Sequence, residues 1–124
     1  MAGLAAPLAV MAGGLIGSGL RAAIVGVLPV DSGGFPVATL SINLAGSMLL
    51  GLYLARRQRA IVARWSLQFW AIGVLGSFTT FSALSVEVFL LIGSGEAVIA
   101  GSYVVISTLG GLAAALLGGR LAGR

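Results

Sequence analysis

Cysteine, histidine and lysine are all absent from this sequence of 124 residues. Without cysteine or histidine, the chain has no disulfide, no thiolate or imidazole catalyst and no ordinary zinc ligands. Carboxylates are nearly absent too, because only Asp31, Glu87 and Glu96 carry one. The side chains needed for a two-carboxylate mechanism or a transition-metal site are therefore missing. No nucleophile paired with a base is evident either. The sequence predicts that the protein is not an enzyme.

Charge of either sign is scarce, since 8% of the residues are charged and 59% are hydrophobic. A soluble globular domain carries about 25% charged residues. So few charges cannot cover a water-soluble surface, and we expect the bilayer to be the main solvent. The net charge of +4 comes entirely from arginine. Arginine beside apolar segments is typical of topology signals and of contact with lipid headgroups, so membrane lipid is an expected partner.

Four apolar segments are long enough to span a bilayer, which requires about 20 mostly apolar residues. They cover approximately residues 7–29, 36–55, 67–92 and 97–121. The expected fold is an all-α membrane protein in which residues 1–124 form one transmembrane domain. Short connections predict that sequential helices are antiparallel neighbours. We expect no cleaved signal peptide, because no basic side chain precedes the first apolar segment.

Arginine placement predicts the orientation in the membrane. With four spans, both termini and the connection between the second and third segments lie on one side. That side carries six arginines: Arg56, Arg57, Arg59, Arg64, Arg120 and Arg124. The opposite side carries Asp31 and Glu96 and no basic residue. Positively charged loops favour the cytoplasm, so we expect a multi-pass protein of the cell membrane with both termini inside.

The third segment contains an unusual polar stretch at its centre, Gly-Ser-Phe-Thr-Thr-Phe-Ser at residues 76–82. Glycine and threonine are weak helix formers, and the hydroxyl groups compete for backbone partners. One interpretation is a helix break between Gly76 and Thr80, which would free carbonyl oxygens suited to a hard cation such as Na⁺. The alternative is a continuous helix whose hydroxyls bond the preceding turn. The pattern alone leaves both open.

Other polar side chains fall on shared helical faces. Thr39, Asn43 and Ser47 are spaced four residues apart in the second segment, as are Tyr103 and Ser107 in the fourth. Polar groups at this depth are costly and often functional. Hydroxyls and amides donate hydrogen bonds, so these faces suit a small anion that has lost its water.

Four further residues of the first and third segments have two possible roles each. Glu87 is either a pore-mouth group or a polar residue of the interface, and Arg21 either snorkels or pairs with another group. The rings of Phe78 and Phe81 flank the threonine pair of the third segment. They either pack against neighbours or turn an electropositive edge toward an anion.

These motifs resemble the Fluc (CrcB) fluoride channels over nearly the whole chain. The matching stretches are Gly-Gly-Leu-Ile-Gly at 13–17 followed by Arg21, Asn-Leu-Ala-Gly-Ser at 43–47, and Gly-Val-Leu-Gly-Ser-Phe-Thr-Thr-Phe-Ser at 73–82 followed by Glu87. Tyr103 and Ser107 fit the last segment. The Gly-x-x-Thr-Thr-Phe-Ser portion is fairly specific, whereas the first stretch is weak by itself.

The resemblance implies a passive fluoride-specific channel that exports fluoride, built as an antiparallel (inverted) dimer with two pathways. It also implies a broken third helix with a structural, non-transported Na⁺ at the dimer centre, held by the carbonyls of Gly76 and Thr79. Asn43 corresponds to a pore-lining residue and Phe81 to a fluoride-contacting aromatic. Ser82, Tyr103 and Ser107 correspond to positions near the polar route, and Arg21, Phe78, Thr80 and Glu87 are further pore or structural candidates.

Two departures from the family pattern concern the partner subunit. Leu84 stands where a second phenylalanine is usual, and Ala83 stands where a hydroxyl is common. The arginine asymmetry is also strong, whereas inverted homodimers tend to have weak charge bias. Both departures favour a paired heterodimer over a homodimer as the working hypothesis.

Two other functions fit part of the pattern. A small four-helix proton-coupled multidrug exporter would need a carboxylate within the first span, but Arg21 is the only charged residue there. A non-transporting membrane assembly subunit would leave Asn43 and the threonine pair unexplained.

Overall fold

The computed structural model describes residues 4–28, 34–60 and 63–123, without the side chain of Arg64. Its elements are α1 (Ala5–Val27), α2 (Val37–Arg57), α3 (Arg64–Ser66), the π-helix η1 (Leu67–Leu75), α4 (Gly76–Phe78), α5 (Phe81–Gly93) and α6 (Ala97–Leu121). Four spans are long and apolar enough to cross a membrane: α1, α2, residues 67–93 and α6. The predicted end of the first span at Pro29, and the predicted positions of Asp31 and Arg124, lie outside the described residues.

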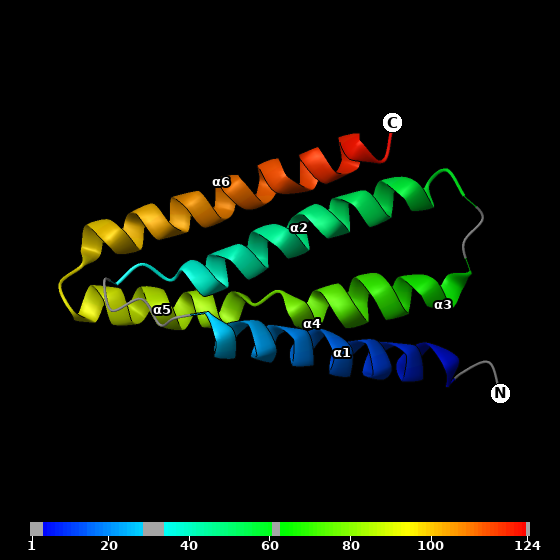
Figure 1. Cartoon of the computed structure of the whole chain (residues 1–124), viewed down its shortest axis with the longest axis horizontal. Helices are drawn as coiled ribbons and strands as arrows, with labels where there is room; N and C mark the ends of the chain where they lie inside the picture. Colours follow the sequence, from blue (N-terminus) through cyan, green and yellow to red (C-terminus); the bar gives the residue numbers. More distant parts are fainter. Residues whose placement is uncertain (1–3, 29–33, 61–62, 124) are drawn as a thin grey trace.

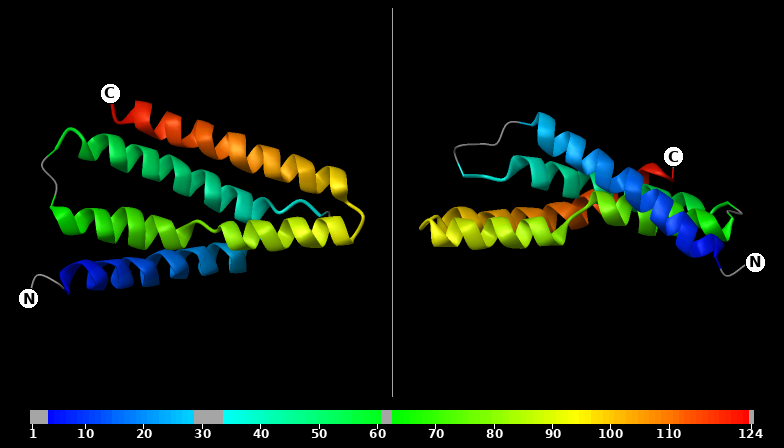
Figure 2. Two further views of the ribbon diagram at one scale, coloured as in Figure 1. Left: turned by 180° about the vertical axis from the view of Figure 1, so that it is seen from behind. Right: turned by 90° about the horizontal axis from the view of Figure 1, so that it is seen from below.

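The spans lie in a row, with α6 beside α2, then the line of α3, α4 and α5, then α1 (Figure 1). The C-terminal ends of α2 and α6 lie at the same end of the row as the start of α1 (Figure 1). Sequential spans run antiparallel, as predicted, but the prediction that they are neighbours is wrong for α1 and α2, because the third span lies between them (Figure 1). The most extensive packing nevertheless joins α2 to α6 and α1 to η1, which are pairs of parallel helices. Seen edge-on, α1 is inclined to the α5–α6 pair (Figure 2, right).

Glycines allow both parallel pairs to pack backbone against backbone. A Cβ atom at Gly17 would overlap the carbonyl oxygen of Val74 in η1. A Cβ at Gly118 of α6 would likewise overlap the carbonyl oxygen of Met48 in α2. In lipid, where no hydrophobic force drives helices together, such close approach provides the van der Waals contact that associates them.

Most of each span faces outward. In an apolar stretch of 18 residues within each span, only 11 to 17% of the residues are buried within the chain. Large apolar side chains such as Leu15 and Leu109 are 76% and 62% exposed. A bilayer or another subunit must cover these faces. The small interior lies between α2, α5 and α6 and is centred on Tyr103, which is 0% exposed and packs edge-to-face on Phe35 at 5.5 Å between ring centroids.

The third span is broken at Thr79 and Thr80, which have extended backbone between α4 and α5 (φ/ψ of −74°/155° and −147°/116°). The break therefore occupies the C-terminal end of the predicted interval of 76–80. Immediately before it, the nine residues of η1 have π-helical hydrogen bonding, which the sequence pattern did not predict. π-Helical turns are rare and are often found at functional sites.

Candidate functional site

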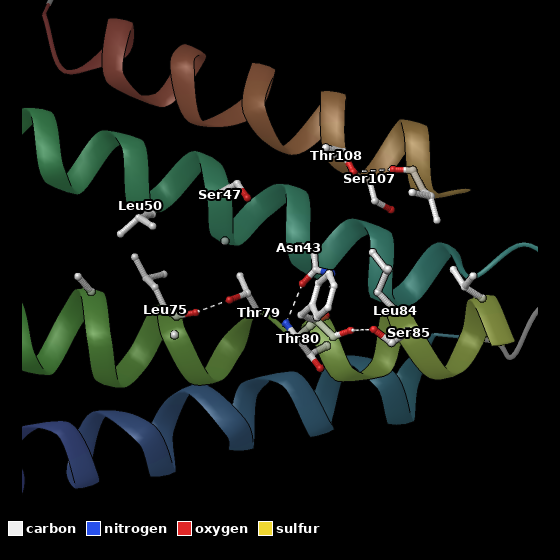
Figure 3. A pocket seen from close by; sticks show the side chains of 16 residues that line it. Asn43, Ser47, Leu50, Leu75, Thr79, Thr80, Leu84, Ser85, Ser107 and Thr108 are labelled. Atoms are coloured by element: carbon white, nitrogen blue, oxygen red, sulfur yellow. Dashed lines mark hydrogen bonds between the residues drawn. The ribbon is translucent and has the colours of Figure 1, made fainter. Parts of the chain in front are cut away.

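Asn43 of α2 binds the backbone of the break. The Nδ2 group donates to the carbonyl oxygen of Thr80 at 3.0 Å, and the N–H of Thr80 donates to Oδ1 of Asn43 at 2.8 Å. Figure 3 shows the carboxamide lying against Thr80 in the gap between α2 and the broken span. One side chain thus satisfies both backbone polar groups of Thr80, a residue that is 7% exposed.

The break redirects two N–H groups away from their helical acceptors. In a continuous helix, the N–H groups of Thr80 and Ala83 would bond the carbonyls of Gly76 and Thr79. Here Thr80 donates to Asn43, and the N–H of Ala83 donates to Oγ1 of Thr80 at 3.1 Å. The two carbonyl oxygens predicted to hold a cation are therefore the two that lose these donors.

A hard cation suits this chemistry better than a transition metal. Carbonyl oxygens are ligands for ions such as Na⁺ and Ca²⁺. Within the described residues, no group of three or more acidic or histidine side chains could hold a metal ion. Gly76 and Thr79 fit a backbone-bound cation on these grounds.

A groove of about 610 Å³ runs past the break between α2, the broken span and α6. Its polar lining includes Asn43, Ser47, Thr80 and Ser107 (Figure 3). Phe81 lies on the same wall and is 81% exposed in the single chain. Hydroxyls, an amide and an aromatic ring therefore share one surface, which is the donor set expected for a small desolvated anion.

Ser107 has a buried hydroxyl with no hydrogen-bond partner among the described residues. The adjacent Thr108 also lines the groove, but its Oγ1 donates to the carbonyl of Val104 at 2.8 Å. Buried hydroxyls nearly always have a partner, so Ser107 offers a donor that no described residue takes up, on a residue of the groove lining.

Glu87 forms a hydrogen-bonded cluster with two other spans. Thr39 of α2 donates to Oε1 at 2.6 Å, and Tyr103 of α6 donates to Oε2 at 2.6 Å. Glu87 is half-buried and bonded from two other spans, and its two predicted roles, a pore-mouth group or a polar residue of the interface, stay predictions. Thr39 was not predicted as a site residue, although its shared face with Asn43 was the available signal.

The predicted pathway residues do not all line one surface. Asn43, Phe81 and Ser107 line the groove, whereas Tyr103 lies behind it and is connected to Glu87. Ser82 instead lines a second cavity of about 420 Å³ with Arg21, Thr80 and Glu87. Thr80 belongs to both hollows, and its hydroxyl lies 3.1 Å from that of Ser82.

Phe78, the first of the two aromatic candidates, has a packing role. It is 8% exposed and lies against Gly46, where a Cβ atom would approach its ring to 3.2 Å. Leu84, Ser85 and Thr108 also line the groove but were not predicted as site residues. Leu84 points from α5 toward α2 (Figure 3), so the position of the missing second aromatic does face the groove.

Comparison with known proteins gives consistent matches. The family described as CrcB-like protein, Camphor Resistance (CrcB), matches residues 8–119. A fluoride-specific ion channel FluC of Oceanobacillus iheyensis is 44% identical over 117 residues, covering 93% of this chain and 89% of the relative. Channels of the same name from Thermus thermophilus and Sphingopyxis alaskensis are 42% and 41% identical, over 94% and 85% of this chain and the same shares of their own length.

Proposed function

This chain belongs to the CrcB family of fluoride-specific ion channels, and from that membership we propose that it provides a passive route by which fluoride leaves the cytoplasm. Its relatives are channels, so the prediction that the protein is not an enzyme is confirmed. Fluoride enters from acidic surroundings as neutral HF, which crosses lipid and dissociates inside. A pathway for the anion then lets it leave down its electrochemical gradient.

The observation that carries the proposal is the orphan hydroxyl of Ser107 on a groove that also presents Asn43 and Phe81. A fluoride ion in the groove would accept from Ser107 and from an Asn43 N–H, and would meet the electropositive edge of the Phe81 ring. These donors replace the water that a strongly hydrated ion loses. No fixed positive charge lines this groove, so the ion would not be trapped there.

A structural Na⁺ held by the carbonyls of Gly76 and Thr79 is the second part of the proposal. Support comes from the hydrogen bonds of the break, which take the helical donors away from both oxygens. The cation would offset the dipoles of these carbonyls and hold the two halves of the span in place. It is a fixed structural ion, not a transported one.

The pathway requires a second subunit in the inverted orientation. Phe81 lines the groove and is 81% exposed in the single chain, so a further surface is needed to cover it. A second copy or a homologous chain would supply that surface. Because the arginines at 56, 57, 59 and 120 all lie at the end of the row where α2 and α6 finish, we place that end, with both termini, in the cytoplasm.

A non-identical partner is our hypothesis for that second subunit. Identical chains with strong arginine bias would insert in one orientation only, and Leu84 leaves one aromatic position on the groove unfilled. Expression of this chain by itself tests the hypothesis. A fluoride-conducting homodimer with half of its subunits in each orientation would contradict it.

The multidrug-exporter alternative is not favoured. Its proton-coupled carboxylate belongs in the first span, and the only charged side chain of α1 is Arg21. Glu87 lies in the third span, where both of its oxygens accept hydrogen bonds from Thr39 and Tyr103. A carboxylate occupied in this way is poorly placed to exchange a proton for a large cation.

Fluoride efflux from liposomes tests the proposal directly. Liposomes containing the chain together with a candidate partner subunit should release fluoride but retain chloride, and removal of Na⁺ should lower the rate. Liposomes containing the chain alone should retain fluoride. Phe81→Ile and Asn43→Asp should each reduce fluoride flux, because one removes the aromatic edge and the other places a negative charge on the route. Unchanged flux in both variants would contradict the assigned pathway.

A further inference from the structure

The carboxamide of Asn43 and the backbone of Thr80 form a reciprocal pair of hydrogen bonds. The distances are 3.0 Å from Nδ2 to the Thr80 carbonyl and 2.8 Å from the Thr80 nitrogen to Oδ1. Thr80 has extended backbone, so the side chain bonds it in the way that a neighbouring β-strand would. The geometry points to Asn43 as a positioning residue that holds the helix break, in addition to its place on the groove wall. This inference rests on the proposed function, because it concerns how that pathway and its cation site are kept in shape.

The chemistry of the site requires an amide at position 43. Thr80 presents one donor and one acceptor in a buried position, and the side-chain amide of asparagine or glutamine carries a donor and an acceptor on separate atoms that can bond both at once. Aspartate would keep an acceptor for the Thr80 N–H but would offer no donor to its carbonyl. A buried backbone group without a partner is costly, so loss of the amide favours closure of the break into continuous helix.

Closure of the break would remove the cation site. If Asn43 released the Thr80 N–H, that group would regain the Gly76 carbonyl as its helical acceptor. One of the two carbonyl oxygens assigned to the cation would then be occupied. Asn43 therefore couples the anion groove to the cation site.

The side-chain amide of Asn43 has a second N–H hydrogen that can bind an ion in the groove. An Nδ2 group carries two hydrogens, and one is donated to the Thr80 carbonyl. The second is available to an ion in the groove that Asn43 lines. An ion that binds this hydrogen would therefore contact a side chain already fixed by the break, which lowers the entropy cost of ordering the ligand.

Hydrogen–deuterium exchange of the purified channel tests the positioning role without relying on flux. In Asn43→Leu, the Thr80 N–H loses the Oδ1 acceptor and regains the Gly76 carbonyl, so the closed helix leaves no cation site for Na⁺ to stabilise. In the wild type, replacing K⁺ by Na⁺ should slow exchange over residues 76–83. This Na⁺ effect should disappear in Asn43→Leu. Asn43→Ser, whose shorter side chain cannot bond both groups, gives the same readout if the leucine variant does not fold.

Ser47→Ala provides the matched control. Ser47 lies one helical turn farther along α2 and lines the same groove, but it makes no hydrogen bond to the break. Exchange at Thr80 and the Na⁺ effect should match the wild type. A Na⁺ effect on exchange that survives both Asn43 substitutions, together with reduced flux, would show that Asn43 acts only as an ion ligand and would overturn the inference. A wild-type protein with no fluoride flux but a normal exchange pattern would instead refute the proposed function alone.

Discussion

The hydroxyl of Tyr103 donates to Oε2 of Glu87 across 2.6 Å, joining the last span to the second half of the broken one. Tyr103 is fully buried, and the other carboxylate oxygen accepts from Thr39 of α2. Three spans therefore meet at one carboxylate just beyond the break. This arrangement fixes α5, the second half of the third span, relative to α2 and α6, which are two walls of the groove.

Tyr103→Phe should therefore lower both stability and fluoride flux. The variant loses one side-chain hydrogen bond, worth about 0.5–1.5 kcal/mol of unfolding free energy. We expect flux to fall by roughly tenfold, because Glu87 is then held from α2 only and the groove wall is less well ordered. Unfolding in mixed detergent micelles and efflux from liposomes measure the two effects.

Tyr53→Phe is the control for Tyr103→Phe. The Tyr53 hydroxyl pairs with that of Ser66 at 2.9 Å, between the last turns of α2 and the short helix α3, at the other end of the third span from α5 (Figure 1). Its loss should cost similar stability and leave flux near wild type. Equal losses of flux in both variants would show that stability alone, and not the Glu87 cluster, governs conduction.

Ser107→Ala should lower fluoride flux without lowering stability, which is the opposite of the result expected for Tyr53→Phe. The Ser107 hydroxyl is buried without a partner, so its removal should leave stability unchanged or raise it by up to about 1 kcal/mol. Flux should fall by roughly tenfold, because an ion in the groove loses a donor worth about 1.4 kcal/mol. Thr108→Val is the control, since the Thr108 hydroxyl already bonds Val104. A flux loss confined to Thr108→Val would reject Ser107 as a ligand.

Gly17→Ala should destabilise the contact between α1 and η1. The added methyl group would overlap the Val74 carbonyl oxygen, and such overpacking costs about 1–3 kcal/mol. Gly19→Ala is a close control, because nothing lies within 4 Å of a Cβ atom there. It should be neutral or stabilising by up to about 1 kcal/mol, as expected from helix propensity. Thermal unfolding of the two purified variants measures the difference, and equal melting temperatures would contradict the observed packing.

Local chemistry made much of this fold predictable. Apolar run length identified the four spans, and the turn between α5 and α6 follows from its glycines, with Gly95 at a φ of 86°. Weak helix formers made a break between Gly76 and Thr80 one of two open interpretations, and the structure places it at Thr79 and Thr80. Long-range geometry was not predictable, because spacing within one segment does not show which span it faces. The bonds from Asn43 to Thr80 and from Thr39 to Glu87 depend on how α2 packs against α4 and α5.

The same limit explains why the candidate residues of the third span lie on different surfaces. Ser82 directly follows Phe81, yet successive residues of a helix point about 100° apart, so the two side chains line different hollows. Phe78 precedes the break and packs inward against Gly46, whereas Phe81 follows it and points outward. The direction of each side chain depends on the exact residue at which the helix stops and restarts, and the composition of the stretch does not specify that residue.

Thr80 caps the restarted helix, and this role predicts an ordered series of substitutions. Its Oγ1 accepts from the Ala83 N–H at 3.1 Å, so Thr80→Val should cost about 0.5–2 kcal/mol through loss of the N-cap. Thr80→Ser keeps the oxygen and should retain most of that stability. Ser85→Ala is the control, because the Ser85 hydroxyl bonds only the Phe81 carbonyl within the same helix.

If the cap also keeps the Ala83 N–H away from the Thr79 carbonyl, Thr80→Val should weaken the Na⁺ dependence of flux while Thr80→Ser preserves it. Equal Na⁺ dependence of flux in the valine and serine variants would show that the Thr80 cap does not contribute to the cation site.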